Sequence, residues 1–257
     1  MDYMQVEFCR RMVTFPMLVL GIATYAFVAG AQEQIYPVRE PVEIKRCQRI
    51  DQPGPYKLVN NLNAAGDCLV ITAEGVTVDL GGFTLTGDET GTAIRGPKVP
   101  KGTIPRVRTL VRNGDISNFA QATDLSGTVE GVRVTANRAG IFVAVGTVIG
   151  NIVQFNASVG IEIADGIVAG NLIVANGIGI SVREAAVITG NEVSGNKIGI
   201  DASGRGSALT GNVVDGNSEI GLSIRCPSNL TNNTAVGNGK NLVLRGTTCR
   251  MSDNLTP

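Results

Sequence analysis

The sequence contains no histidine, and only 4% of its residues are aromatic. The missing imidazole excludes metal sites built on histidine and any catalysis that uses histidine as acid or base. The scarcity of aromatic residues argues against a globule built around large side chains and favours a thin core. Neither sign of charge is in excess, because 22 basic residues balance 22 acidic ones. The chain therefore has no overall field that would attract nucleic acid or an acidic membrane.

Residues 1–31 have the pattern of an export signal. Arg10 and Arg11 precede an apolar run over residues 12–28, and the small residues 29–31 follow it as a cleavage site. Polar residues and a proline interrupt the run, which disfavours a permanent membrane span. We expect cleavage, a secreted or periplasmic mature protein formed by residues 32–257, and no membrane span after cleavage.

Four cysteines lie beyond this segment: Cys47, Cys68, Cys226 and Cys249. An even number of cysteines in an exported chain favours disulfide bonds, and three connectivities are open. We expect the pairs Cys47–Cys68 and Cys226–Cys249, because their separations of 21 and 23 residues are each about one repeat of the pattern described next. Each bond would then join adjacent turns near one end of the domain.

A Gly-Asn pair recurs at nearly constant spacing in the second half of the chain. It occupies residues 150–151, 170–171, 190–191 and 211–212, and Asn232-Asn233 continues the series at steps of 20 or 21 residues. Self-similarity at this period indicates a solenoid, in which each repeat buries its apolar side against its neighbours. Alternation such as Ile161-Glu162-Ile163 is typical of strands with one buried face, and no helical periodicity is present.

Alignment on the Gly-Asn pairs places like residues in columns. Buried amides in a column can hydrogen-bond to their copies above and below, and two asparagine columns are expected to do so: Asn151, Asn171, Asn191, Asn212, Asn233 and Asn156, Asn176, Asn196, Asn217, Asn238. We predict an all-β fold, a single-stranded right-handed parallel β-helix solenoid with about eight coils of 20–21 residues between Val70 and Leu244. A left-handed β-helix would repeat about every 18 residues, and leucine-rich repeats need a helical outer side.

Two segments lack the repeat pattern. Three prolines interrupt residues 88–106, which we expect to protrude as a loop, and residues 120–128 are expected to form a shorter loop. The region between residues 95 and 112 has no acidic residue and contains six cations: Arg95, Lys98, Lys101, Arg106, Arg108 and Arg112. These cations form either a patch that attracts anions or an ordinary solvated basic loop.

Three N-terminal stretches resemble a known group of proteins. They are residues 47–58 (CQRIDQPGPYKL), 66–71 (GDCLVI) and 78–87 (VDLGGFTLTG). They are similar to the opening coils of secreted right-handed β-helix proteins of the pectate-lyase-like superfamily, and the later Gly-Asn coils resemble its carbohydrate-binding and sugar-hydrolase repeats. The resemblance covers about residues 44–250. It implies a polysaccharide as partner.

The resemblance supplies no catalytic residues. Polygalacturonase-like members use clustered aspartates with a Gly-His-Gly element, and this chain has neither Gly-His-Gly nor Asn-Thr-Asp. Phe83 occupies the position after Gly82 where such proteins often have histidine. Calcium-dependent lyases require clustered carboxylates with an arginine or lysine base. We predict no cofactor and no metal site.

One outward face combines acids with arginines. Two neighbouring columns are expected to point outward: Glu162, Ser181, Asp201, Ser223, Val243 and Ala164, Arg183, Ser203, Arg225, Arg245. Glu162 and Asp201 would lie about 9–10 Å apart along the stack, the upper limit for a water-using carboxylate pair. The columns form either a solvated polar face or a binding strip whose arginines grip the carboxylates of a glycan.

A second outward strip is aliphatic and contains Ile152, Leu172 and Val213. Such a strip requires a cover, either another part of this chain or a second copy in a homodimer. We expect an extracytoplasmic protein that binds, or acts on, acidic polysaccharide or a cell-surface glycan along its outer strand face. The alternative is a non-catalytic structural or adhesive surface protein, and a polysaccharide lyase or epimerase comes third.

Overall fold

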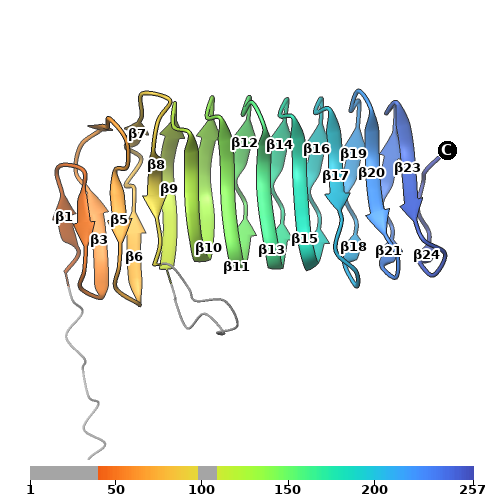
Figure 1. Cartoon of the computed structure of the whole chain (residues 1–257), viewed down its shortest axis with the longest axis horizontal. Helices are drawn as coiled ribbons and strands as arrows, with labels where there is room; N and C mark the ends of the chain where they lie inside the picture. Colours follow the sequence, from red (N-terminus) through yellow and green to blue (C-terminus); the bar gives the residue numbers. More distant parts are fainter. Residues whose placement is uncertain (1–39, 98–108) are drawn as a thin grey trace, which may run out of the picture. The chain divides into compact units, whose positions relative to one another are not determined.

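The computed structural model describes residues 40–97 and 109–257. These residues form parallel strands and no helix, wound into about 10 turns that follow one another along the stack (Figure 1). The predicted all-β parallel solenoid is confirmed. The stack holds more turns than the expected eight because residues 42–63 also form a turn ahead of Val70. No helix in the described residues is long and apolar enough to cross a membrane.

Each turn contributes a strand segment to three faces, which we call A, B and C. Face A contains the Gly-Ile repeat of the later turns. It has ten segments in file: β2 (Gln48–Ile50), β5 (Leu69–Ile71), β8 (Thr92–Arg95), the first parts of β10 (Gln121–Thr135), β11 (Ala139–Ile149), β13 (Val159–Ala169) and β15 (Ile178–Thr189), then β17 (Ile198–Ala202), β20 (Ile220–Arg225) and β23 (Lys240–Arg245).

Faces B and C follow face A around each turn. Face B consists of β1 (Val42–Ile44), β3 (Gly54–Leu58), β6 (Val76–Asp79), the start of β9 (Thr109–Ser117), the later parts of β10, β11, β13 and β15, and then β18 (Ala208–Thr210), β21 (Asn229–Thr231) and β24 (Arg250–Ser252). Face C consists of β4 (Leu62–Asn63), β7 (Thr84–Thr86), the ends of β9 and β10, β12 (Ile152–Gln154), β14 (Leu172–Val174), β16 (Glu192–Ser194), β19 (Val213–Asp215) and β22 (Thr234–Val236).

The core is a continuous file of aliphatic side chains along the axis. On face A, Ile161 pairs with Ile180, and the file continues through Ile200 and Leu222. All four side chains are fully buried. Because side chains alternate across a strand, the residue between two such columns must point to solvent. The register of the core therefore decides which residues face a ligand.

Two asparagine ladders hold the bends on either side of face C. In the first ladder, the backbone N–H and the side-chain Nδ2 of Asn171 both donate to Oδ1 of Asn191, at 3.0 and 2.9 Å. This pattern runs without interruption from Asn151 to Asn254, and in the second ladder from Asn137 to Asn241. Each interior amide is buried with its donors and acceptor satisfied, so it stabilises the bend. The predicted columns are confirmed.

The Gly-Ile repeat has a steric cause. A Cβ atom on Gly199 would lie only 2.6 Å from the carbonyl oxygen of Gly221 and 2.6 Å from Cγ1 of Val214. Gly140 and Gly179 face the same obstacle, with the carbonyl oxygen of the next turn's glycine at 2.2 and 2.6 Å. In these turns the backbones approach too closely at the start of face A for a side chain, whereas Ala93, Ala122 and Asn241 occupy the equivalent position in other turns.

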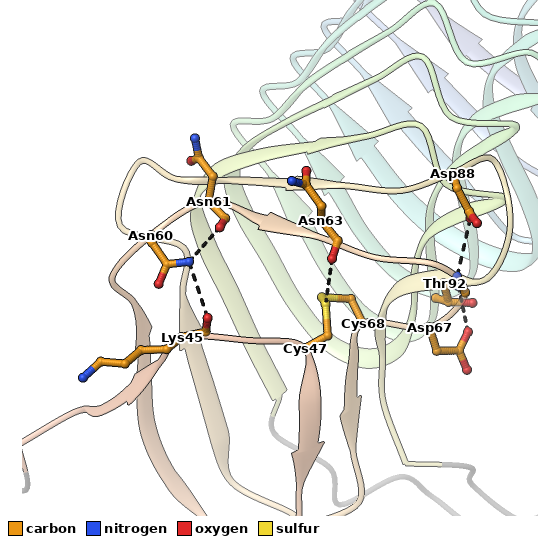
Figure 2. The surroundings of a disulfide bond; sticks show 10 residues. Lys45, Cys47, Asn60, Asn61, Asn63, Asp67, Cys68, Asp88 and Thr92 are labelled. Carbon is orange, nitrogen blue, oxygen red and sulfur yellow. Dashed lines mark hydrogen bonds between the residues drawn. A yellow bond between two sulfur atoms is a disulfide. The ribbon is translucent and has the colours of Figure 1, made fainter.

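Both predicted disulfides are present. Cys47–Cys68 joins the turns of β2 and β5, and Cys226–Cys249 joins the last two turns, with Cα–Cα distances of 4.4 and 4.8 Å. Figure 2 shows the first bond with Asn63, whose carbonyl oxygen lies 4.0 Å from Sγ of Cys47. Each bond therefore joins adjacent turns near one end of the stack, as the spacing predicted.

The predicted loop boundaries were wrong in two places. Residues 92–95, assigned to the protruding loop 88–106, form β8 and pair with both β5 and β10. Residues 120–128, assigned to a shorter loop, lie mostly in β10, which continues from face A into face B. The prolines and the missing Gly-Asn marker concealed these strands. Residues 98–108 of the expected loop and the expected signal segment 1–31 lie outside the described residues.

Candidate binding face

Face A presents a single outward file along the whole stack. Strand pairing places these residues in succession: Arg49, Val70, Arg95, Asp124, Phe142, Glu162, Ser181, Asp201, Ser223 and Val243. Glu162 and Asp201 are separated by one strand, that of Ser181, as the sequence predicted. The file is mixed in charge, and most of its acids lie in the middle.

Arg183 is held in place between two members of this file. Its Nε donates to Oε1 of Glu162, and its guanidinium lies over the ring of Phe142 at 5.2 Å from the ring centre. A guanidinium over an aromatic face is attracted by the electrons of the ring. Glu162 is consequently a partner of Arg183, and its carboxylate is only partly open to solvent.

Arg245 forms the corresponding ion pair with the second acid, Asp201. Its guanidinium donates to Oδ1 of Asp201 and to the hydroxyl of Ser223, so it reaches back along the file by two turns. Both acids of the predicted carboxylate pair are therefore neutralised by arginines from the flanking column.

An open cavity of about 470 Å³ lies where face A turns into face B, and we call it the A–B pocket. Three arginines and two acids contribute to its lining, which consists of Asp165, Arg183, Glu184, Ala185, Ser203, Gly204, Arg205 and Arg225. The bend between the two faces is longer in the turn of β17 and β18 than in the turns immediately before and after it, and Arg205 lies there in a loop that β13 lacks. This insertion accounts for the step of 21 residues from Gly190 to Gly211.

Arg205 and Arg225 are exposed and have no ion-pair partner among residues 40–97 and 109–257. Their guanidinium groups are therefore available to an anion, unlike those of Arg183 and Arg245. Arg225 was among the predicted binding residues. Arg205 was missed because it occupies a loop that no other repeat shares, and only its cationic character could have indicated it.

The predicted basic loop is only partly within the described residues. Arg95 lies on face A in β8, where its Nη2 donates to Asp67 at 3.1 Å and to the hydroxyl of Thr92 at 3.0 Å. Arg112 lies on face B and pairs with Asp79 at 3.1 Å. Both cations have acidic partners and so do not form a free basic patch. The other four, Lys98, Lys101, Arg106 and Arg108, fall outside the described part of the chain.

The outward file of face A offers no tyrosine, histidine or lysine between Arg49 and Val243. Among the ten residues of this file, the groups of a kind that takes or gives a proton in catalysis are therefore the carboxylates of Asp124, Glu162 and Asp201. Within the described residues, no three carboxylates or thiols are grouped so as to hold a metal ion. The face can accept hydrogen bonds and pair with anions, and neither task requires proton transfer.

Two aliphatic areas lie away from the A–B pocket. On face C, Val213 is 45% exposed while Ile152 and Leu172 are half-buried, and Glu192 interrupts the predicted strip between Leu172 and Val213. Face B carries a second area that the sequence analysis did not identify, consisting of Val145, Ile149, Ile167 and Val187. The predicted cover over the first strip is not found among the described residues, and the homodimer remains a prediction.

Comparison with known proteins identifies a shared fold. No family model matches the chain, and no curated protein matches it by sequence. Among solved structures, the A-module of the Azotobacter vinelandii mannuronan C-5 epimerase AlgE4 is similar, with a TM-score of 0.56 and 13% identity over 80% of this chain and 76% of that one.

A second solved structure, a mutant of the periplasmic alginate epimerase AlgG, has a TM-score of 0.50 and 12% identity over 81% of this chain and 75% of that one. Identities this low show likeness of fold alone. The right-handed parallel β-helix expected from the resemblance to the pectate-lyase-like superfamily is thus the fold that this chain shares with both epimerases.

Proposed function

We propose that the protein binds an acidic polysaccharide along face A, with the A–B pocket as the point where a uronate carboxylate is held. The observation that carries the proposal is the pair of exposed arginines, Arg205 and Arg225, which line one pocket and have no acidic partner among the described residues. A guanidinium can hold a carboxylate through two parallel hydrogen bonds.

The remaining lining favours a sugar over a simple polyanion. Asp165 and Glu184 line the same pocket. Their carboxylates would repel closely spaced phosphates, whereas they accept hydrogen bonds from hydroxyl groups. A uronate residue carries both a carboxylate and several hydroxyls, and so it suits a pocket with both kinds of group. The two similar solved structures are named as epimerases of mannuronan and alginate, which are polymers of this kind.

Binding fits the face better than catalysis does. Epimerisation and elimination both remove a proton from a sugar carbon, and so they need a base that is free to accept it. Two of the three acids in the face A file, Glu162 and Asp201, are already paired with Arg183 and Arg245, and the third, Asp124, does not line the A–B pocket. We therefore propose a binding role, in which these ion pairs keep the surface rigid beside the pocket.

An extracytoplasmic location is part of the proposal. Two disulfides join adjacent turns, and such bonds persist in oxidising compartments. The N-terminal export pattern supports the same location. Polysaccharides with exposed uronates are then within reach of the protein.

The test is binding of purified protein to polymannuronate, pectate and neutral dextran, measured by affinity electrophoresis. We expect retardation by the two polyuronates, weakened by salt, and none by dextran. The double variant Arg205→Ala/Arg225→Ala should lose at least about tenfold in affinity, because each charged contact contributes more than a neutral one. Arg133→Ala on face C, whose side chain pairs with Asp115, is the matched control and should bind normally.

Two results would contradict the proposal. Equal retardation by dextran and the polyuronates would show that the arginines do not select the ligand. Formation of unsaturated products, or a change in uronate configuration during incubation, would show that face A is catalytic.

A further inference from the structure

A second site lies at the bend that leads from face C into face A. From β9 to β22, each turn has at this bend one residue in the left-handed backbone conformation: Asn118, Ala136, Phe155, Ala175, Gly195, Gly216 and Gly237. Asparagine and glycine adopt this conformation readily, whereas a bulky side chain does so at a cost. Phe155 has a φ of 56° and is nevertheless 61% exposed. It combines a strained backbone with an aromatic ring in water.

The stack holds the backbone of Phe155 in place. The backbone N–H of Phe155 donates to the carbonyl oxygen of Val174 in the next turn at 3.2 Å, so the strained residue stays within the stacked bend. Nothing in the core uses the ring, since the neighbouring Val153 and Asn156 fill the interior. An exposed aromatic residue held in an unfavourable conformation points to a function outside the fold.

A cavity of about 510 Å³ lies beside the ring, and we call it the C–A pocket. It extends over four successive bends and is lined by Glu89, Asn118, Ala136, Asn137, Arg138, Phe155 and Ala157. Neighbouring turns are about 4.8 Å apart, so the pocket follows the stack for three such steps. Its length along the stack suits an extended ligand better than a small ion.

The polar groups of the C–A pocket are of two kinds. Asn137 is buried and its amide already bonds to Asn156, Ile116 and Thr135, so it belongs to the ladder. Glu89 and Arg138 are exposed, and their side chains have no ion-pair partner in the described segments 40–97 and 109–257. The pocket thus offers one aromatic face, one free guanidinium and one free carboxylate.

We propose that the C–A pocket is a second subsite for a uronate residue of an acidic polysaccharide. The apolar face of the sugar ring stacks on Phe155, its carboxylate pairs with Arg138, and its hydroxyls donate to Glu89. This inference rests on the proposed function and adds to it a subsite at the opposite edge of face A from the A–B pocket. It also explains why phenylalanine occupies a position that glycine fills in three other turns.

The experiment uses Phe155→Gly, with affinity for polymannuronate oligosaccharides measured by calorimetry. Glycine removes the ring and also relieves the backbone, so the variant should melt at the same or a higher temperature while its affinity falls about tenfold. Ala175→Gly makes the same backbone change one turn further on, outside the pocket lining, and should bind as wild type does. Phe155→Trp keeps an aromatic ring at this position, so it should stack on the sugar and bind about as tightly as wild type.

The outcomes separate this proposal from the proposed function. Unchanged affinity in Phe155→Gly and in Arg138→Ala, with a loss in Arg205→Ala/Arg225→Ala, would overturn the C–A subsite alone. A lower melting temperature in Phe155→Gly would also overturn it, because the ring would then serve the fold. Failure of the wild-type protein to bind any polyuronate would overturn both proposals.

Discussion

The turns after Ala139 and the turns before it share one fold but close their bends by different means. In the later turns, the same asparagine closes the same bend each time, and the amides form two unbroken ladders. In the earlier turns, residues of different types close the bends. Asn61 accepts from the N–H of Thr84, Asp67 from that of Thr92, and Asp79 from that of Gly81.

The difference shows where sequence can vary. A ladder amide depends on an identical amide on each side, so a change at one level disturbs its neighbours as well. A local acceptor such as Asn61 serves one turn only. The C–A pocket lies in the irregular turns and at their border with the regular ones, where bend residues are free to differ. The ladder turns contribute the regular face on which the A–B pocket is built.

The largest expected effect comes from Asn191→Ala in the middle of the first ladder. This change removes the acceptor of two hydrogen bonds from Asn171 and the donor of three more, all at a buried position. We expect a loss of about 4 kcal/mol in the free energy of unfolding, because several buried polar groups are left unsatisfied. Asn61→Ala in the irregular half should cost about 1 kcal/mol or less, because one bond is lost at an exposed residue.

Denaturant unfolding of both variants checks this prediction. Asn254→Ala at the end of the same ladder is the control and should fall between them, since no further asparagine follows it. Equal losses in Asn191→Ala and Asn61→Ala would remove the distinction between the two halves.

Removal of a disulfide ranks next. Cys47→Ala/Cys68→Ala and Cys226→Ala/Cys249→Ala should each cost about 3 kcal/mol, because the closed loops are of similar length. The local response should differ, since the Asn233–Asn254 bonds still join the last two turns after the second change. Hydrogen exchange should therefore accelerate in β2 and β5 of the first variant more than in β21 and β24 of the second. The reverse order would contradict a role for the ladder in holding the end of the stack.

A third comparison lies within the regular half. Gly199→Ala should cost about 2 kcal/mol or more, because its Cβ would lie 2.6 Å from a backbone oxygen of the next turn. A Cβ atom on Gly190 would meet no atom within 4 Å. Gly190→Ala should therefore lower the free energy of unfolding by only about 1 kcal/mol, because alanine is strained at the φ of 60°. Thermal melting of the two variants separates crowding from backbone strain, and equal shifts would show that crowding is unimportant.

The smallest effect concerns the bend between β7 and β8. The hydroxyl of Thr90 donates to Asp88, and with backbone N–H groups it holds the pKa of Asp88 below the ordinary value of an aspartate. A lowered pKa means that ionised Asp88 favours the folded state above the ordinary pKa, and that this contribution is lost as pH falls through the lowered value. Thr90→Val should return the pKa of Asp88 towards the ordinary value in an NMR titration. An unchanged titration would show that the hydroxyl is not responsible.

The regular half of the fold was predictable from the sequence because its physical requirements repeat. The asparagine of Asn171 and the glycine of Gly199 recur at the same positions in successive turns, since the first must meet a copy of itself and the second must avoid a backbone oxygen. The disulfides followed from the same period. The strand at Thr92–Arg95 was missed because nothing at Thr92 or Gln121 resembles its partner in the next turn, although their backbones pair. Where the paired side chains differ, the sequence has no repeat from which the pairing of the strands could be recognised.

The candidate site was predictable only where it follows the columns. Glu162, Asp201, Arg183, Arg225 and Arg245 lie on face A because strand alternation requires it. That Arg183 and Arg245 neutralise the two acids depends on side-chain reach across one or two turns, which spacing alone does not give. Arg205 lies in a bend whose length differs from turn to turn, whereas Phe155 lies in a bend whose backbone conformation repeats while its side chains differ. Their roles therefore required the structure.

The measurement that tests the central claim most directly is a crystal structure of the protein with a defined oligouronate. The account predicts sugar density along face A, with one carboxylate paired to Arg205 and Arg225 in the A–B pocket. Density confined to the aliphatic areas of face B or face C, with both arginines unoccupied, would contradict it.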